Sequence, residues 1–148
     1  MTLAIGSDHA GYALKEQLRQ HLLEAGHLVL DFGAYSEDRA DYPDHAHPVA
    51  CAVLTEEADY GLVICGSGNG INMTVNKYAG IRSALCWNAE LAALARAHNN
   101  ANVLALPARY IATDVAIACL DSFLLTDFEG GRHEGRVQKI ADKIQDCK

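Results

Sequence analysis

The fold class follows from residues 60–70, which read YGLVICGSGNG. The run from Tyr60 to Cys65 is almost continuously apolar, which is typical of a strand buried on both faces of a parallel sheet. Glycine then occupies every second position up to Gly70, which predicts a tight turn. A short helix is expected over residues 71–77. A buried strand that leads through glycines into a helix is typical of α/β proteins.

The same alternation of short apolar runs and longer helical patterns extends in both directions from this stretch. Strands are predicted over residues 2–6, 27–31, 60–65, 81–86 and 102–106. Helices are predicted over about 10–25, 43–57, 71–77, 88–97, 113–125 and 132–147. Gly26 suits a helix end and Asn88 suits a helix start. The sequence therefore predicts one domain, residues 1–148, built as a three-layer αβα sandwich around a five-stranded parallel sheet of Rossmann-like type.

Composition excludes several classes of protein. A net charge of −7 disfavours binding to nucleic acid or to an anionic membrane. No apolar run reaches the length of a membrane-spanning helix. The 5 cysteines are widely spaced, without a C-x-x-C pair, and residues 1–6 lack the features of a signal peptide. We expect free thiols and a cytoplasmic protein.

The strongest candidate site is the turn from Cys65 to Gly70, because ligands of parallel sheets bind beyond the carboxyl ends of the strands. Successive backbone N–H groups and the following helix start can hold a phosphate or a developing oxyanion. The same positive field favours a thiolate at Cys65 and makes it a candidate base. A buried structural cysteine beside an ordinary turn is the alternative, and the density of glycine places it second.

Three other glycine-rich or cysteine motifs fail at this turn. Ile71 stands where a G-x-G-x-x-G dinucleotide turn needs glycine. No lysine follows Gly70, as a P-loop requires. A C-x5-R phosphatase would need arginine at position 71. The turn therefore predicts an anion site of another kind.

Further polar residues follow other predicted elements. Asp8 and His9 come directly after the first strand. In one interpretation Asp8 caps the following helix and His9 is a surface residue. In the other, Asp8 is a catalytic acid and His9 binds a phosphate. Arg109 follows the fifth strand. His98 and Asn99 lie at the end of a predicted helix. His98 could simply interact with the helix dipole, or it could belong to an acid–base cluster beside a sugar, and the local sequence favours neither.

Arg132 and Arg136 are four residues apart and share one helix face. Two arginines near a helix start are unfavourable unless they bind an anion, so they predict a phosphate site. Glu129 and Glu134 offer the alternative of simple ion pairs.

His45 and His47, with Asp41 and Asp44 nearby, are residue types that could bind a metal. A spacing of two residues points helical side chains in different directions, so no metal is expected.

Taken in order, these motifs resemble the type B ribose-5-phosphate isomerase family, which also contains galactose-6-phosphate isomerase subunits. The matching segments are residues 7–11, 41–43, 64–71, 76–77, 80–82, 98–99, 102–103, 129–133 and 136. The resemblance implies strand order 2-1-3-4-5, no cofactor, and a homodimer or tetramer whose sites are shared between subunits. The last helix, about 132–147, would pack on the partner.

The resemblance also implies a role for each site residue in exchanging ribose 5-phosphate and ribulose 5-phosphate. Cys65 would move the proton between C2 and C1. A cis-enediolate would be stabilised by Ser67 and the backbone of Gly66, Gly68, Asn69 and Gly70. Asp8 and His98 would open the furanose ring. The remaining substrate contacts would come from His9, Tyr42, Asn99, Arg109, Arg132 and Arg136.

Two alternatives stay open. The substrate could be another sugar phosphate, such as galactose or allose 6-phosphate or a tetrose phosphate, or the chain could be a non-catalytic sugar-phosphate-binding module. Some members of the family use a carboxylate as the base, whereas this chain keeps Cys65. Cys65, His98 and both late arginines occur in one chain, which favours a homodimer.

Overall fold

The computed structural model describes residues 1–141, in which five strands alternate with helices. The strands are β1 (Thr2–Ser7), β2 (Leu28–Asp31), β3 (Tyr60–Cys65), β4 (Ser83–Leu85) and β5 (Val103–Pro107). The helices are α1 (Tyr12–Glu24), α2 (Tyr42–Leu54), α3 (Asn69–Val75), α4 (Ala89–Asn99), α5 (Thr113–Leu125), the 3-10 turn η1 (Gly131–His133) and α6 (Glu134–Ile140). The predicted bounds of β3 and α5 are confirmed.

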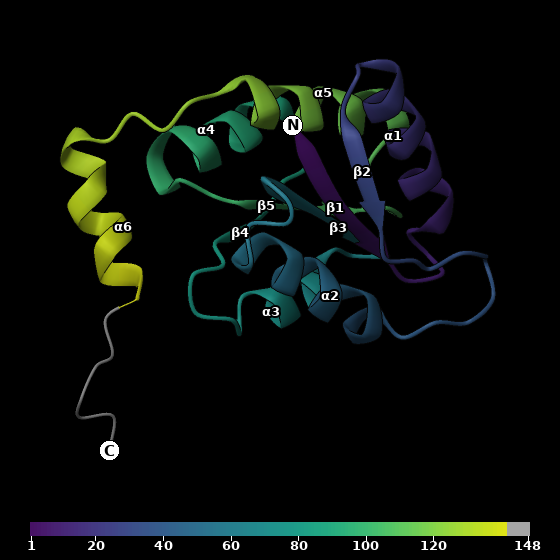
Figure 1. Ribbon diagram of the computed structural model, residues 1–148. Helices are drawn as coiled ribbons and strands as arrows, with labels where there is room; N and C mark the ends of the chain where they lie inside the picture. The colour runs from purple at the N-terminus through teal and green to yellow at the C-terminus, as the bar shows by residue number, and fades with distance from the viewer. Residues whose placement is uncertain (142–148) are drawn as a thin grey trace.

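The strands form one fully parallel sheet between two helical layers, as predicted (Figure 1). Helices α1, α4 and α5 cover one face, where Leu62 and Ile64 of β3 join their buried side chains. Helices α2 and α3 cover the other face, where Val63 and Cys65 lie. Successive side chains of a strand point to opposite faces, so this apolar strand supplies both cores.

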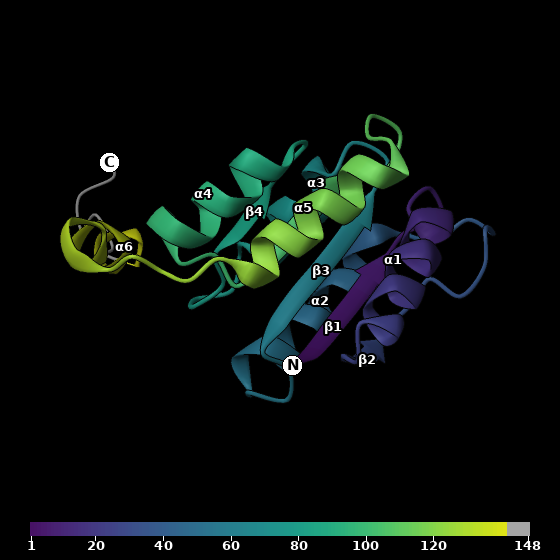
Figure 2. The same ribbon diagram turned by 90° about the horizontal axis from the view of Figure 1, so that it is seen from above.

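The strand order is β2-β1-β3-β5-β4, so the expected order 2-1-3-4-5 is wrong at its last two strands. Parallel crossovers are right-handed, so the face on which a helix lies sets the direction in which the chain moves. Helix α4 lies on the same face as α1, and the chain therefore turns back after β4 (Figure 2). The burial of the two strands is consistent with this order, because β5 is buried at every residue whereas β4 is a short, half-buried edge strand.

The end of the described chain stands apart from the sandwich (Figure 1). The predicted helix over 132–147 begins instead as η1 and continues as α6, and residues 142–148 lie outside the described part. None of the side chains of α6 is buried, and Ile140 is 59% exposed. Within residues 1–141, no helix is both long and apolar enough to cross a membrane.

Helix ends follow local chemistry. Asn88 caps α4 by accepting a hydrogen bond from the Leu91 backbone N–H at its side-chain oxygen (2.8 Å), as predicted. Gly26 follows α1 with a φ of +82°, the left-handed conformation expected of a glycine after a helix. Because α4 runs antiparallel to the strands, its last residues lie at the amino edge of the sheet.

Candidate active site

The glycine-rich turn at the carboxyl end of β3 is closely packed on its neighbours. Gly68 has a φ of +74°, and a Cβ there would collide with a methyl group of Leu85. A Cβ on Gly70 would lie 2.5 Å from the ring of Tyr42. Only glycine fits at both positions, so the close packing of the turn against Leu85 and Tyr42 depends on these glycines. Cys65, at the head of the turn, is 4% exposed.

Arg109 lies directly against this turn. Its backbone N–H donates to the Gly66 carbonyl (3.0 Å), and a Cβ on Gly66 would lie 3.2 Å from the Arg109 Nη1. The end of β5 therefore places a guanidinium beside the amides that follow β3. A cation beside the backbone N–H groups of a glycine-rich turn is suited to bind an anion.

Asp8 and His9 lie at the same edge of the sheet, at the end of β1. The Asp8 backbone N–H donates to the Ile64 carbonyl (3.2 Å), and its Oδ1 accepts from the Gly11 N–H (2.9 Å). Asp8 is buried, and this contact fixes its carboxylate beside the last residues of β3. His9 is partly buried, with Nδ1 3.1 Å from the Ala40 carbonyl oxygen. Asp8, His9, Cys65 and Arg109 thus share one edge.

A cavity of about 610 Å³ opens beside the turn. It is lined by Ser67, Asn69, Leu85, Trp87, Pro107 and Tyr110. Ser67 Oγ accepts from the Asn69 N–H (3.3 Å), so both residues are held at the cavity wall. Trp87 and Tyr110 were not expected from the sequence, although both follow strands, which is the signal that identified Arg109.

His98 and Asn99 lie at the opposite edge, at the end of α4. Beneath them the buried Arg96 donates from Nη1 to the Ala101 carbonyl (2.6 Å) and from Nη2 to the Tyr60 hydroxyl (3.1 Å). These bonds fix the end of α4 beside the start of β3. Because Tyr60 and Cys65 are the two ends of β3, the two edges are separated by about 16 Å.

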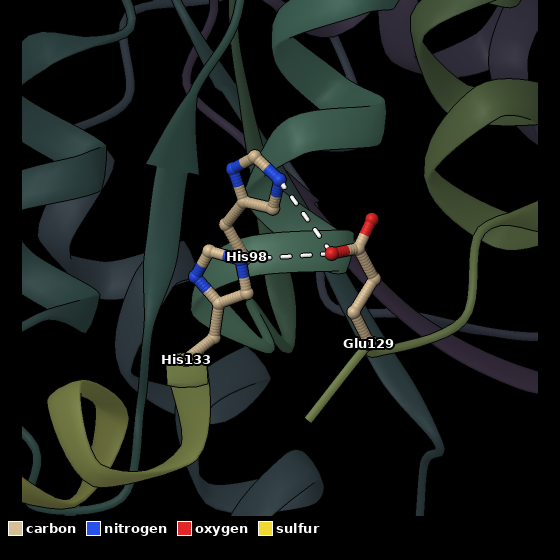
Figure 3. A group of neighbouring side chains, drawn as sticks. All are labelled: His98, Glu129 and His133. Carbon is tan, nitrogen blue, oxygen red and sulfur yellow. Dashed lines mark ion pairs between the residues drawn. The ribbon is translucent and has the colours of Figure 1, made fainter. Parts of the chain in front are cut away.

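The side chain of His98 stacks on that of His133 (Figure 3). The ring centroids are 4.2 Å apart and the planes are inclined by 11°. Glu129 Oε2 lies 3.9 Å from His98 Nε2 and 3.6 Å from His133 Nε2. Arg132 Nε donates to His133 Nε2 (3.4 Å). Burial, together with His98 and Arg132, lowers the pKa of His133 and favours its neutral form.

The donor atoms of His98, Glu129 and His133 all lie within 4.8 Å of one another, a spacing that a metal ion could bridge. The lone pair of each imidazole nitrogen lies in its ring plane, and two nearly parallel planes do not meet at one cation. The arrangement of His98 and His133 is therefore that of stacked rings and not that of two ligands of one metal ion. His45 and His47 are also separated, since they contact the Phe32 carbonyl and the Tyr78 hydroxyl respectively.

Arg132 and Arg136 belong to the same edge as His98, on η1 and α6. Among residues 1–141 neither guanidinium forms an ion pair with a carboxylate, so the alternative of pairing with Glu129 or Glu134 is not what the structure shows. Both side chains are exposed. One chain thus holds two separate clusters of predicted site residues, with Cys65 in one and His98 in the other.

The model of the family described as Ribose/Galactose Isomerase matches residues 3–140. The chain belongs to the ribose/galactose isomerase family. Ribose-5-phosphate isomerase B of Escherichia coli is 44% identical to it over 138 residues, 93% of each chain. A ribose 5-phosphate isomerase structure from Thermotoga maritima is 49% identical, with a TM-score of 0.93 over 95% of this chain and 97% of that chain.

A third isomerase of this family comes from Mycoplasma genitalium and was solved with bound ribulose-5-phosphate. It is 42% identical, with a TM-score of 0.90 over 95% of this chain and 93% of that chain. The match to the isomerase family over residues 3–140 therefore includes both clusters of predicted site residues. The expected family is confirmed.

Proposed function

We propose that this chain is an aldose–ketose isomerase that interconverts ribose 5-phosphate and ribulose 5-phosphate, with Cys65 as the base. The observation that carries the proposal is the position of the Cys65 thiol at the head of a glycine-rich turn, with Arg109 against that turn. A relative solved with ribulose-5-phosphate supports the substrate.

The proton transfer needs a base and an oxyanion stabiliser. The Cys65 thiolate takes the C2 proton of the open-chain aldose, a C1=C2 double bond forms, and the C1 carbonyl electrons move to O1. Ser67 and the amides from Gly66 to Gly70 stabilise this cis-enediolate. The proton returns to C1 as C2 becomes the carbonyl carbon and the O2 proton passes to O1.

The cyclic form of ribose 5-phosphate must open before this step. Asp8 takes the proton of the anomeric hydroxyl, and His98 gives a proton to the ring oxygen. Asp8 lies beside Cys65, whereas His98 is at the other edge of the sheet. A single chain therefore does not bring this pair together.

A homodimer resolves this separation. His98, Asn99, Arg132 and Arg136 of one subunit would complete the half-site of Asp8, His9, Tyr42 and Cys65 in the other. Helix α6, which has no buried side chain within its own subunit, would pack on the partner. His9 and Arg109 would bind the phosphate together with the two late arginines of the second subunit.

Another sugar phosphate remains the nearest alternative, because the family includes galactose isomerases. Comparing kcat/KM for four-, five- and six-carbon phosphates separates these cases, since a pocket shaped for one length loses contacts with another. Within residues 1–141 the thiols of Cys51, Cys65, Cys86 and Cys119 are free, which supports the expected cytoplasmic location.

The test of function is Cys65→Ser. We expect kcat to fall by about 10³-fold, since the base is lost, while sugar-phosphate affinity is kept. The exposed Cys51→Ser is the matched control and keeps full turnover. A binding module would show no turnover in the wild type and no effect of either change.

A further inference from the structure

His98 does not stand alone at the end of α4. Its ring is covered on one side by His133 and approached at Nε2 by Glu129 (Figure 3). His133 is only 5% exposed, although it lies on a segment outside the sandwich. The sequence assigned neither residue a role beyond a neighbour of the arginines.

The backbone fixes both neighbours against the end of α4. The Glu129 N–H donates to the Ala97 carbonyl (3.0 Å), the residue before His98. The His133 N–H then donates to the Gly130 carbonyl (3.0 Å), and Gly130 has a φ of +64°, which favours glycine. A turn anchored in this way presents Glu129 and His133 to His98 as a unit.

We propose that Glu129 and His133 are positioning residues that hold the His98 imidazole for ring opening. The inference rests on the proposed function. His133 sets the plane of the ring by stacking, and the Glu129 carboxylate balances the charge of His98 when it is protonated. A carboxylate that orients an imidazole and stabilises its cation is an established arrangement in catalysis.

The charges around His98 suit this role. A neutral His133 can stack on a protonated His98 without two cations facing each other. Burial lowers the pKa of His133 and favours its neutral form; Arg132 acts in the same direction and donates to its Nε2. The 3.9 Å from Glu129 to His98 is longer than a hydrogen bond, and such contacts commonly tighten when substrate binds.

The ring-opening step that His98 assists balances in atoms and electrons without a cofactor. The anomeric O–H proton leaves, its electron pair forms C1=O1, and the C1–O4 bond breaks with its pair going to O4. His98 supplies the proton that O4 receives. Glu129 and His133 act only through His98 and touch neither C1 nor O4.

Ribulose 5-phosphate permits a direct test, because its O5 carries the phosphate and it cannot close a five-membered ring on C2. Exchange of its C1 hydrogen with deuterated water requires Cys65 and the enediolate but no ring opening. Turnover of ribose 5-phosphate requires both ring opening and proton transfer. The two assays on the same enzyme separate ring opening from proton transfer.

The variants are Glu129→Gln, which keeps the size of the side chain, and His133→Phe, which keeps a stacking ring. Both should lower kcat for ribose 5-phosphate by about 10- to 100-fold, part of the usual contribution of acid–base catalysis, with KM almost unchanged. Exchange at C1 of ribulose 5-phosphate should stay within about 2-fold of the wild type. Glu129→Asp should restore part of kcat because it restores the charge.

The matched control is Glu134→Gln, which removes one exposed carboxylate from the same segment without a contact to His98. It should leave both assays unchanged. The proposal is overturned if the Glu129 and His133 variants keep full turnover, or if exchange falls as far as turnover. A wild type without turnover and without exchange would instead refute the proposed function itself.

Discussion

Cys65 and His98 lie at opposite edges of the same parallel sheet. Cys65 ends β3, whereas the end of α4 is fixed to Tyr60 at the start of that strand through Arg96. Two residues expected in one active site are therefore separated by about the length of a strand, or about 16 Å. The separation makes the proposed dimer testable through subunit mixing.

Two inactive variants should restore each other. Cys65→Ala and His98→Ala homodimers should each show little turnover. Mixed by unfolding and refolding together, they form heterodimers in which one site has both wild-type residues, so about a quarter of wild-type activity should return. The heterodimer is quantified by native mass spectrometry. Heterodimers without activity would show that the sites are not shared in this way.

The late arginines should act on substrate binding. Arg132→Ala and Arg136→Ala should each raise KM for ribose 5-phosphate by about 10- to 100-fold, because each removes a charge-assisted contact to phosphate. Lys139→Ala removes an equal charge from α6, the helix that carries Arg136, and should have little effect. Unchanged KM in both arginine variants would remove them from the phosphate site.

The thiols should differ in reactivity. Burial raises the pKa of Cys86 to about 12 and that of Cys119 to about 11, so both stay protonated at pH 8 and should resist iodoacetamide. With Cys51 and Cys147 replaced by serine, inactivation should follow modification of Cys65 and should be slowed by ribose 5-phosphate. Peptide mass spectrometry checks the assignment. Activity that survives full modification of Cys65 would contradict its role.

Lys15 should matter for stability. Its side chain is fully buried, and Nζ lies 2.7 Å from both carboxylate oxygens of Asp31. Removing one partner of such a pair is costly, so Lys15→Met should lower the free energy of unfolding by about 3 kcal/mol, measured by urea denaturation. Arg19→Gln breaks a partly exposed pair with Glu16 and should cost less than about 1 kcal/mol. Equal effects would show that the burial of Lys15 is not what matters.

The sheet could be predicted because its signal is local. A buried strand such as β3 is apolar along its whole length, and the residues themselves mark its bounds. The lateral position of β5 is not a local property. It depends on the face on which α4 lies, and the helical pattern of residues 88–97 does not tell which face that is.

The candidate site also has a part that could be predicted from the local sequence and a part that could not. Asp8 and Arg109 follow strands and Cys65 ends one, so the rule for parallel sheets places them together without further information. His98 follows a helix, and its local pattern was balanced between two roles. Glu129 and His133 were missed as neighbours of His98, because their contact depends on how residues 126–133 cross the end of α4.

The most direct test of the central claim is the conversion of ribose 5-phosphate to ribulose 5-phosphate by the purified protein after treatment with EDTA. The reaction needs only an acid, a base and an oxyanion stabiliser. We predict robust turnover, which Cys65→Ser reduces by orders of magnitude without loss of substrate affinity. Absence of turnover by the wild type, or full turnover by Cys65→Ser, would contradict the account.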